Sequence, residues 1–168
     1  MHYKVIAIAL TVVIVCSQTN VCTQKRGSKM NDQPLSVKVK CRGNDQCLFD
    51  GKDIPIDILV YNNEKNDVGF PLEYVKHKSP IIKLTDTRTK AETFLETHIA
   101  SWDLKEKFTS IRPGEFVTTG WIITADELQQ FGADVDLYAE VTIMADILVN
   151  RQKTEFKGSD TIHITKKK

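Results

Sequence analysis

The strongest fold signal in this chain is the stretch IPIDILVYN, residues 54–62. Isoleucine or valine stands at every second position from 54 to 60, whereas Asp57 and Tyr61 fall on the opposite phase. A period of two sends successive side chains to opposite faces of an extended strand, so that one face packs on a core and the other meets water. The turn-forming run at 62–67 then ends the segment. Residues 54–62 are therefore predicted to form a half-buried β-strand.

The same alternation recurs on both sides of this stretch. In residues 35–41, Leu35, Val37 and Val39 alternate with Ser36 and Lys38, which predicts a second strand. Further strands are predicted at 80–84, 91–99, 116–123, 137–149 and 161–165. About seven short strands at this spacing favour an all-β, antiparallel sandwich.

One short helix is predicted between two of these strands. Thr124 is a good N-cap and Glu127 stands three residues on, which is the capping-box pattern. Gly132 is placed to end the turn beyond it. Two polar runs, 86–90 with Arg88 at its centre and 150–153, are predicted to be hairpin tips.

Residues 111–115 contain the motif that most resembles known domain families. Ile111 and Arg112 precede Pro113-Gly114-Glu115, and the alternating strand 116–123 follows. With this motif, the layout of residues 54–147 resembles the immunoglobulin-like β-sandwich domains of the intracellular proteinase inhibitor family, and also the non-catalytic β domain that accompanies aspzincin metallopeptidases. The resemblance implies an immunoglobulin-like sandwich, and its first group implies protease inhibition. The His-Glu-x-x-His helix of a zinc peptidase is absent from the sequence.

The N-terminus has the layout of an export signal. Lys4 precedes an apolar run from Val5 to Val15, which would rise only about 16 Å as a helix and is too short to span a bilayer. Residues 1–17 are therefore predicted to be a signal peptide, 18–34 a flexible leader and 35–168 the sandwich domain. Two processing routes fit. Cleavage after Ser17 yields a secreted or periplasmic protein, and acylation of Cys16 yields a lipoprotein anchored to the cell envelope.

Charge argues against two classes of partner. The chain has 23 basic and 22 acidic residues, and removal of residues 1–17 takes away one lysine and no acid. The resulting balance offers no attraction to nucleic acid or to an anionic membrane surface. No membrane span is expected after the signal.

The cysteines indicate one disulfide. Cys41 and Cys47 flank a turn-forming run that brings them within bridging distance in an oxidising compartment. Cys22 has no evident partner and is either free or paired between chains. No second pair of cysteines or histidines stands at ligand spacing, so no metal site is predicted.

Catalytic patterns are missing, and the chain is predicted not to be an enzyme and to need no cofactor. His77 lies in a polar connector, His98 is predicted on a strand, and His163 alternates with isoleucines so that it points away from the core. No serine stands in a Gly-x-Ser-x-Gly elbow, and no glycines are grouped to hold a phosphate.

Aromatic residues in connectors are the candidate binding site. Trp102 stands between polar residues and is predicted at the surface, whereas Trp121 lies in an apolar strand and is predicted in the core. Phe70 and Tyr74 belong to a Pro-containing segment, 69–74, that is predicted to be a second aromatic loop, and Arg88 is the next candidate. The favoured function is an exported, non-catalytic module that binds a protein, as a protease inhibitor or an assembly subunit. A carbohydrate- or small-ligand-binding module is the alternative.

Overall fold

The computed structural model of the chain describes residues 33–43 and 46–167. The predicted signal peptide and most of the leader, with Cys16 and Cys22, lie outside the described residues. In chain order the elements are β1 (Leu35–Cys41), β2 (Leu48–Phe49), β3 (Ile54–Asn62), β4 (Val68–Phe70), α1 (Leu72–Lys78), β5 (Ile81–Asp86), β6 (Glu92–Phe94), the 3-10 helix η1 (Trp102–Glu106), β7 (Thr109–Ile111), β8 (Phe116–Ile123), α2 (Ala125–Gln129), β9 (Asp136–Val149) and β10 (Gln152–Lys166). The described part of the chain is thus mostly β.

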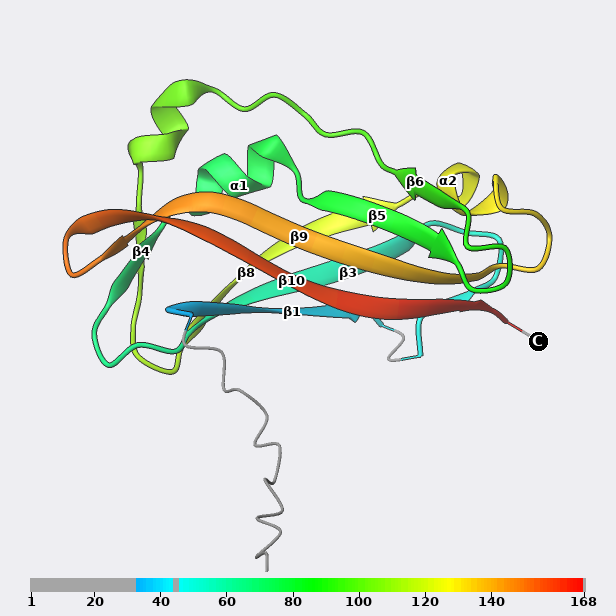
Figure 1. Cartoon of the computed structure of the whole chain (residues 1–168), viewed down its shortest axis with the longest axis horizontal. Helices are drawn as coiled ribbons and strands as arrows, with labels where there is room; N and C mark the ends of the chain where they lie inside the picture. The colour runs from blue at the N-terminus through cyan, green and yellow to red at the C-terminus, as the bar shows by residue number, and fades with distance from the viewer. Residues whose placement is uncertain (1–32, 44–45, 168) are drawn as a thin grey trace, which may run out of the picture. The chain divides into compact units, whose positions relative to one another are not determined.

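The strands form two sheets that lie one over the other (Figure 1). The smaller sheet has the order β1-β3-β8, and the larger has the order β2-β10-β9-β4-β7, with β5 beside β9 and β6 beside β5. The central strand β3 places Ile58 opposite Val39 of β1 and opposite Thr119 of β8. An all-β, two-sheet architecture is therefore confirmed. The strands pair antiparallel, as predicted, except that the two residues of β2 pair with the end of β10 in parallel.

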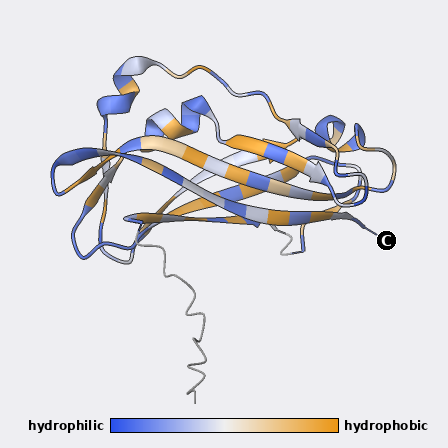
Figure 2. Ribbon diagram, viewed as in Figure 1, coloured by the Kyte–Doolittle hydropathy of each residue, from blue (hydrophilic) through white to orange (hydrophobic). Residues whose placement is uncertain are grey.

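The core lies between the sheets, on the faces that the alternation predicted. Ile54, Ile56, Ile58 and Val60 of β3 are buried, and on β9 every second residue from Leu137 to Ile147 is buried as well. Figure 2 shows the resulting apolar and polar bands along β9 and β10. Each fully buried large side chain contributes about 1.5–3 kcal/mol of hydrophobic free energy, so these two strands account for much of the stability.

Several strand boundaries differ from the prediction. The expected strand at 91–99 is only Glu92–Phe94, and the expected strand at 161–165 begins instead at Gln152. Residues 152–155 are all exposed, so they carry no period of two, and their hydrogen-bonded partner β9 keeps them extended. The short strands β2, β4 and β7 were not predicted, because two or three residues are too few to show an alternation.

The predicted helix is confirmed as α2. The Glu127 N–H donates to Thr124 Oγ1 at 3.3 Å, and the Thr124 N–H donates to Glu127 Oε2 at 2.7 Å, which completes the capping box. The second helix, α1, corrects the prediction of an aromatic loop at 69–74. Its first turn carries Glu73 and its last turn is basic, which suits the helix dipole, and its inward side buries Tyr74.

The predicted disulfide is present between the end of β1 and the start of β2. Cys41 Sγ and Cys47 Sγ are 2.05 Å apart, and their Cα atoms are 5.4 Å apart. Both residues are buried in the core cluster. The bridge therefore holds the turn that leads from the smaller sheet to the larger.

The predicted hairpin tip between β5 and β6 is organised by one buried carboxylate. Asp86 Oδ1 accepts the Thr89 N–H at 2.6 Å, the Arg88 N–H at 2.9 Å and the Thr89 hydroxyl at 3.0 Å. These hydrogen bonds, led by the Thr89 N–H, hold the pKa of Asp86 below its usual value.

A pH-dependent loss of stability follows for Asp86. A carboxylate with a lowered folded-state pKa stabilises the fold fully above its unfolded pKa of about 4, and that contribution is lost as the pH falls through the folded value. We expect Asp86→Ala to have a lower Tm than the wild type at neutral pH, and the difference to shrink below about pH 4. Thermal melts between about pH 2 and 7 measure this. Glu96→Ala, which removes an exposed carboxylate, is the control, and a difference that stays constant down to the lowest pH would rule out the role of the charge.

Candidate functional site

A long connector, residues 95–108, joins β6 to β7 and is called the arch here. It contains one short element, η1, and runs over α1 in Figure 1 before it descends to β7. Connections of this length are uncommon in compact domains, and those that persist are frequently functional. The arch is therefore the first place to search for a binding surface.

Hydrogen bonds hold the arch at defined points. The Leu95 N–H donates to Ile82 O at 2.9 Å, at the exit from β6. The His98 N–H lies 3.1 Å from Lys78 O and 2.9 Å from Ser79 Oγ, at the end of α1. At the other end, Lys153 Nζ of the β9–β10 hairpin contacts Glu106 Oε1 at 2.6 Å. The arch is thus fixed to the domain on both sides of its most exposed residues.

The arch exposes large apolar side chains. Ile99 is fully exposed, at 100% of its accessible area, and Trp102 is 75% exposed. Phe94, which immediately precedes the arch, is 64% exposed. Single exposed apolar residues are common, but two on one anchored connector form a surface that gains free energy when a partner covers it.

Trp102 is held in place by a neighbouring cation. Lys105 Nζ lies 3.7 Å from the centre of the Trp102 ring and 5.3 Å from the centre of the Tyr74 ring. A cation–π contact of this kind contributes about 0.5–1 kcal/mol at an exposed site. The indole therefore has a preferred orientation before any partner arrives, which lowers the entropic cost of binding.

The structure separates the residues that were predicted to act together. Trp102 is at the surface, as predicted. Phe70 is completely buried in β4 and Tyr74 is buried in α1, so the prediction that they present a surface loop is wrong. Arg88 lies at the β5–β6 tip, where its guanidinium donates to Asp134 O at 2.8 Å. Figure 1 shows that tip at the opposite end of the sheets from η1.

The histidines do not assemble a catalytic centre. His98 lies in the arch rather than on a strand, and its ring packs edge-on against Trp121 at 5.3 Å. Trp121 packs against the core but is half-buried, so it is less enclosed than predicted. His163 points outward, as predicted, and its Nε2 is 2.6 Å from Asp136 Oδ1. This contact is the main cause that lowers the pKa of Asp136. Within residues 33–43 and 46–167, no group of three or more metal-ligating side chains is found.

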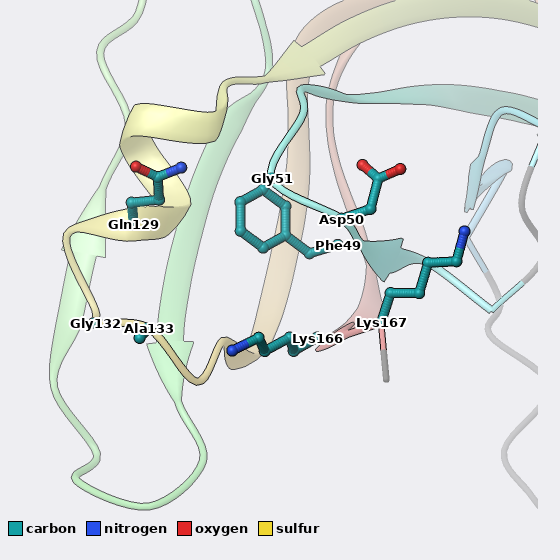
Figure 3. Close-up of a pocket in the computed structure, with 8 residues that line it drawn as sticks. All are labelled: Phe49, Asp50, Gly51, Gln129, Gly132, Ala133, Lys166 and Lys167. Carbon is teal, nitrogen blue, oxygen red and sulfur yellow. The ribbon is translucent and has the colours of Figure 1, made fainter.

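A hollow lies at the end of β10, beside α2. It has a volume of about 610 Å³ and is lined by Phe49, Asp50, Gly51, Gln129, Gly132, Ala133, Lys166 and Lys167. Figure 3 shows the two lysine ammonium groups pointing away from one another. Lys166 Nζ is moreover 3.4 Å from Asp134. Because the polar groups do not converge, this hollow lacks the directed contacts that fix a small ligand.

One residue of the arch was missed by the sequence reasoning. Ile99 was assigned to a strand because it follows a partly alternating run, and an isoleucine on a strand is normally expected to face a core. The available signal was polar: Thr97 and Ser101, two residues before and two residues after Ile99, are both polar, so the apolar alternation does not continue on either side. Its exposure follows from the tertiary path of the arch.

No family model and no curated protein matches the chain. Among the solved structures that match the chain are two of low sequence identity and low TM-score. One is described as the X-ray structure of Northeast Structural Genomics Consortium target SoR45, with 9% identity, a TM-score of 0.41, and coverage of 79% of this chain and 86% of that chain. The other is a protein from Archaeoglobus fulgidus, with 14% identity, a TM-score of 0.35, and coverage of 79% and 96%. In the part of the chain described here, no helix has the length and hydropathy to cross a membrane.

Proposed function

We propose that this chain is an exported, non-catalytic module that binds another protein through the arch. The observation that carries the proposal is the exposure of Ile99 and Trp102 on a connector that is held by backbone hydrogen bonds at one end and by a side-chain ion pair at the other. Protein interfaces are centred on a few large side chains that become buried in the complex, and tryptophan is enriched among them. A protruding surface of this kind suits a protein partner better than a small molecule, which needs a concave site.

The proposed partner is a protease, with the chain as its inhibitor. Residues 96–101 form no helix or strand, and all but Ala100 are exposed. The two hydrogen bonds of the His98 N–H fix this segment, so that little conformational entropy is lost when it binds. An extended segment can dock by main-chain hydrogen bonds, with its side chains entering pockets, as peptides do in a cleft. If the chain is instead an assembly subunit, the same surface of the arch binds a neighbouring subunit.

The proposal extends to the cellular compartment and to the fold family. The Cys41–Cys47 disulfide suits an oxidising compartment, which supports secretion or a periplasmic location. Cleavage after Ser17 and acylation of Cys16 are distinguished by intact mass, because only the second adds a lipid. We also propose that the sandwich is immunoglobulin-like. The Pro113-Gly114-Glu115 turn that precedes β8 supports this classification.

Affinity capture with matched variants tests the binding surface. The purified protein, the double variant Ile99→Ala/Trp102→Ala and the control Phe94→Ala are immobilised and exposed to extracellular or periplasmic extract. We expect the wild type and the control to retain the same protein, and the double variant to lose it, because each anchor typically contributes more than about 1 kcal/mol. A retained protease that loses activity on addition of the wild type supports inhibition. Equal retention by all three, or retention of glycans alone, contradicts the proposal.

A further inference from the structure

Strand β8 is an edge strand of the smaller sheet. In the described residues it pairs with β3 alone. Its sequence, FVTTGWII, contains no charged residue and no proline. Natural proteins usually protect an exposed edge with lysine, proline, a bulge or a covering segment, because unpaired N–H and C=O groups are a template for another strand. This edge has neither the charge nor the proline. Helix α1 and the ring of His98 lie near β8 on its inner side, and the side chains of Phe116 and Ile122 on the outer face remain exposed.

The hydrogen-bonding phase of β8 can be read from its neighbours. The Asn62 N–H donates to Glu115 O at 2.9 Å, whereas Pro55 O accepts the Arg42 N–H at 2.8 Å on the other side of β3. Backbone groups alternate in direction along an antiparallel strand, so the odd-numbered residues of β8 from 117 to 121 bond to β3. The even-numbered residues from 116 to 122 therefore direct their N–H and C=O groups to the open edge.

The same even-numbered residues carry a protruding side chain and a hollow. Phe116 and Ile122 are 50% and 53% exposed on the outer face of the sheet. A hollow of about 440 Å³ is lined by Arg42, Gly120, Trp121 and Ile122. The aromatic ring thus lies at one end of the strand and the hollow at the other, with Thr119 midway between Phe116 and Ile122 in the sequence.

We propose that two copies of this chain pair through β8, antiparallel, about a two-fold axis that passes through Thr119. In this register Phe116 lies opposite Ile122 of the second copy, and Thr118 lies opposite Gly120. Each pair occurs twice, as a two-fold interface requires. All four positions of one copy offer their N–H and C=O groups to the other, which joins the two small sheets into one.

The side chains favour a second copy over any other strand. The Phe116 ring of one copy enters the hollow of the other, where the Arg42 guanidinium, held by Asp57 at 2.7 Å, lies beside it for a cation–π contact. Gly120 leaves room for that guanidinium, since an added Cβ would lie 2.7 Å from Arg42 Nη2. A two-fold axis also brings identical residues of the two copies close together, so charged residues there would repel one another. Strand β8 contains no charged residue.

Sedimentation equilibrium of the purified protein tests the pairing. We expect a concentration-dependent mass that reaches twice that of one chain. Phe116→Lys should raise the dimer dissociation constant at least about tenfold, because the ring is the main anchor. The matched control is Phe94→Lys, which places lysine on the exposed edge strand β6 and should leave the constant unchanged. Unaltered circular dichroism and Tm show that each variant is folded.

Amide hydrogen exchange tests the register. At high protein concentration, exchange at the Thr118 and Gly120 N–H groups should slow, whereas exchange at the Thr119 N–H should not change. A protein that stays monomeric up to about 1 mM would overturn the proposal. So would a dimer that survives Phe116→Lys with the same constant, or one whose new protection lies outside β8.

Discussion

Replacing Phe70 by alanine is expected to lower the free energy of unfolding by about 3–5 kcal/mol. Phe70 is completely buried, and its strand β4 joins β7 to β9 in the larger sheet. Removing the ring loses its transfer free energy and leaves a cavity in a core that can collapse only in part. Urea denaturation measures the loss as a lower midpoint with an unchanged m-value.

Phe94→Ala is the matched control for this experiment. It removes the same side chain from a site that is 64% exposed, and we expect a change within about 0.5 kcal/mol. A loss below about 1 kcal/mol for Phe70→Ala would contradict the burial of this ring and return Phe70 to the list of surface candidates.

Gly158→Val is expected to destabilise the protein by about 1–3 kcal/mol through overpacking. Gly158 lies on β10 where that strand passes β1, and Asp160 Oδ2 accepts the Val39 N–H at 2.8 Å beside it. A Cβ at position 158 would lie 2.5 Å from Phe156 Cζ and 2.8 Å from Val37 Cγ2, so the side chains must move or the two strands must separate.

Two further variants identify the cause of that loss. Ser159→Val places valine at the neighbouring, exposed position of β10 and should change the stability little. Val37→Ala should recover part of the loss when combined with Gly158→Val, because it removes one of the two close contacts. Strictly additive effects in thermal melts would show that the contact with Val37 is not the origin.

The fold was largely predictable because burial imposes a period that the sequence records. Ile54, Ile56 and Ile58 are all buried, and no polar residue interrupts this inward-facing series, so the period of two is unambiguous. The first four residues of β10, 152–155, show no such period, since both of their faces are exposed and only the ladder with β9 keeps them extended. Helix α1 was missed because Pro71 and the flanking aromatic residues are also typical of a loop.

The candidate site was predictable only in part. Trp102 stands among polar residues, and its exposure could be inferred from its neighbours. Phe70 and Tyr74 stand in a Pro-containing segment that is also typical of a loop, but the pairing of β4 and the docking of α1 bury them. Ile99 is exposed because the arch, fixed to the domain by hydrogen bonds at Leu95 and His98, turns its side chain outward, and no local pattern encodes that path.

Titration of the captured protein against three variants tests the central claim, that the arch binds a protein partner. Trp102→Ala should raise the dissociation constant at least about fivefold, which corresponds to a loss of about 1 kcal/mol of binding free energy, without a change in Tm. Phe94→Ala and Phe116→Lys should bind like the wild type, because they lie outside the arch. Wild-type affinity for Trp102→Ala, or an equal loss in all three, would contradict the assignment of the arch as the binding surface.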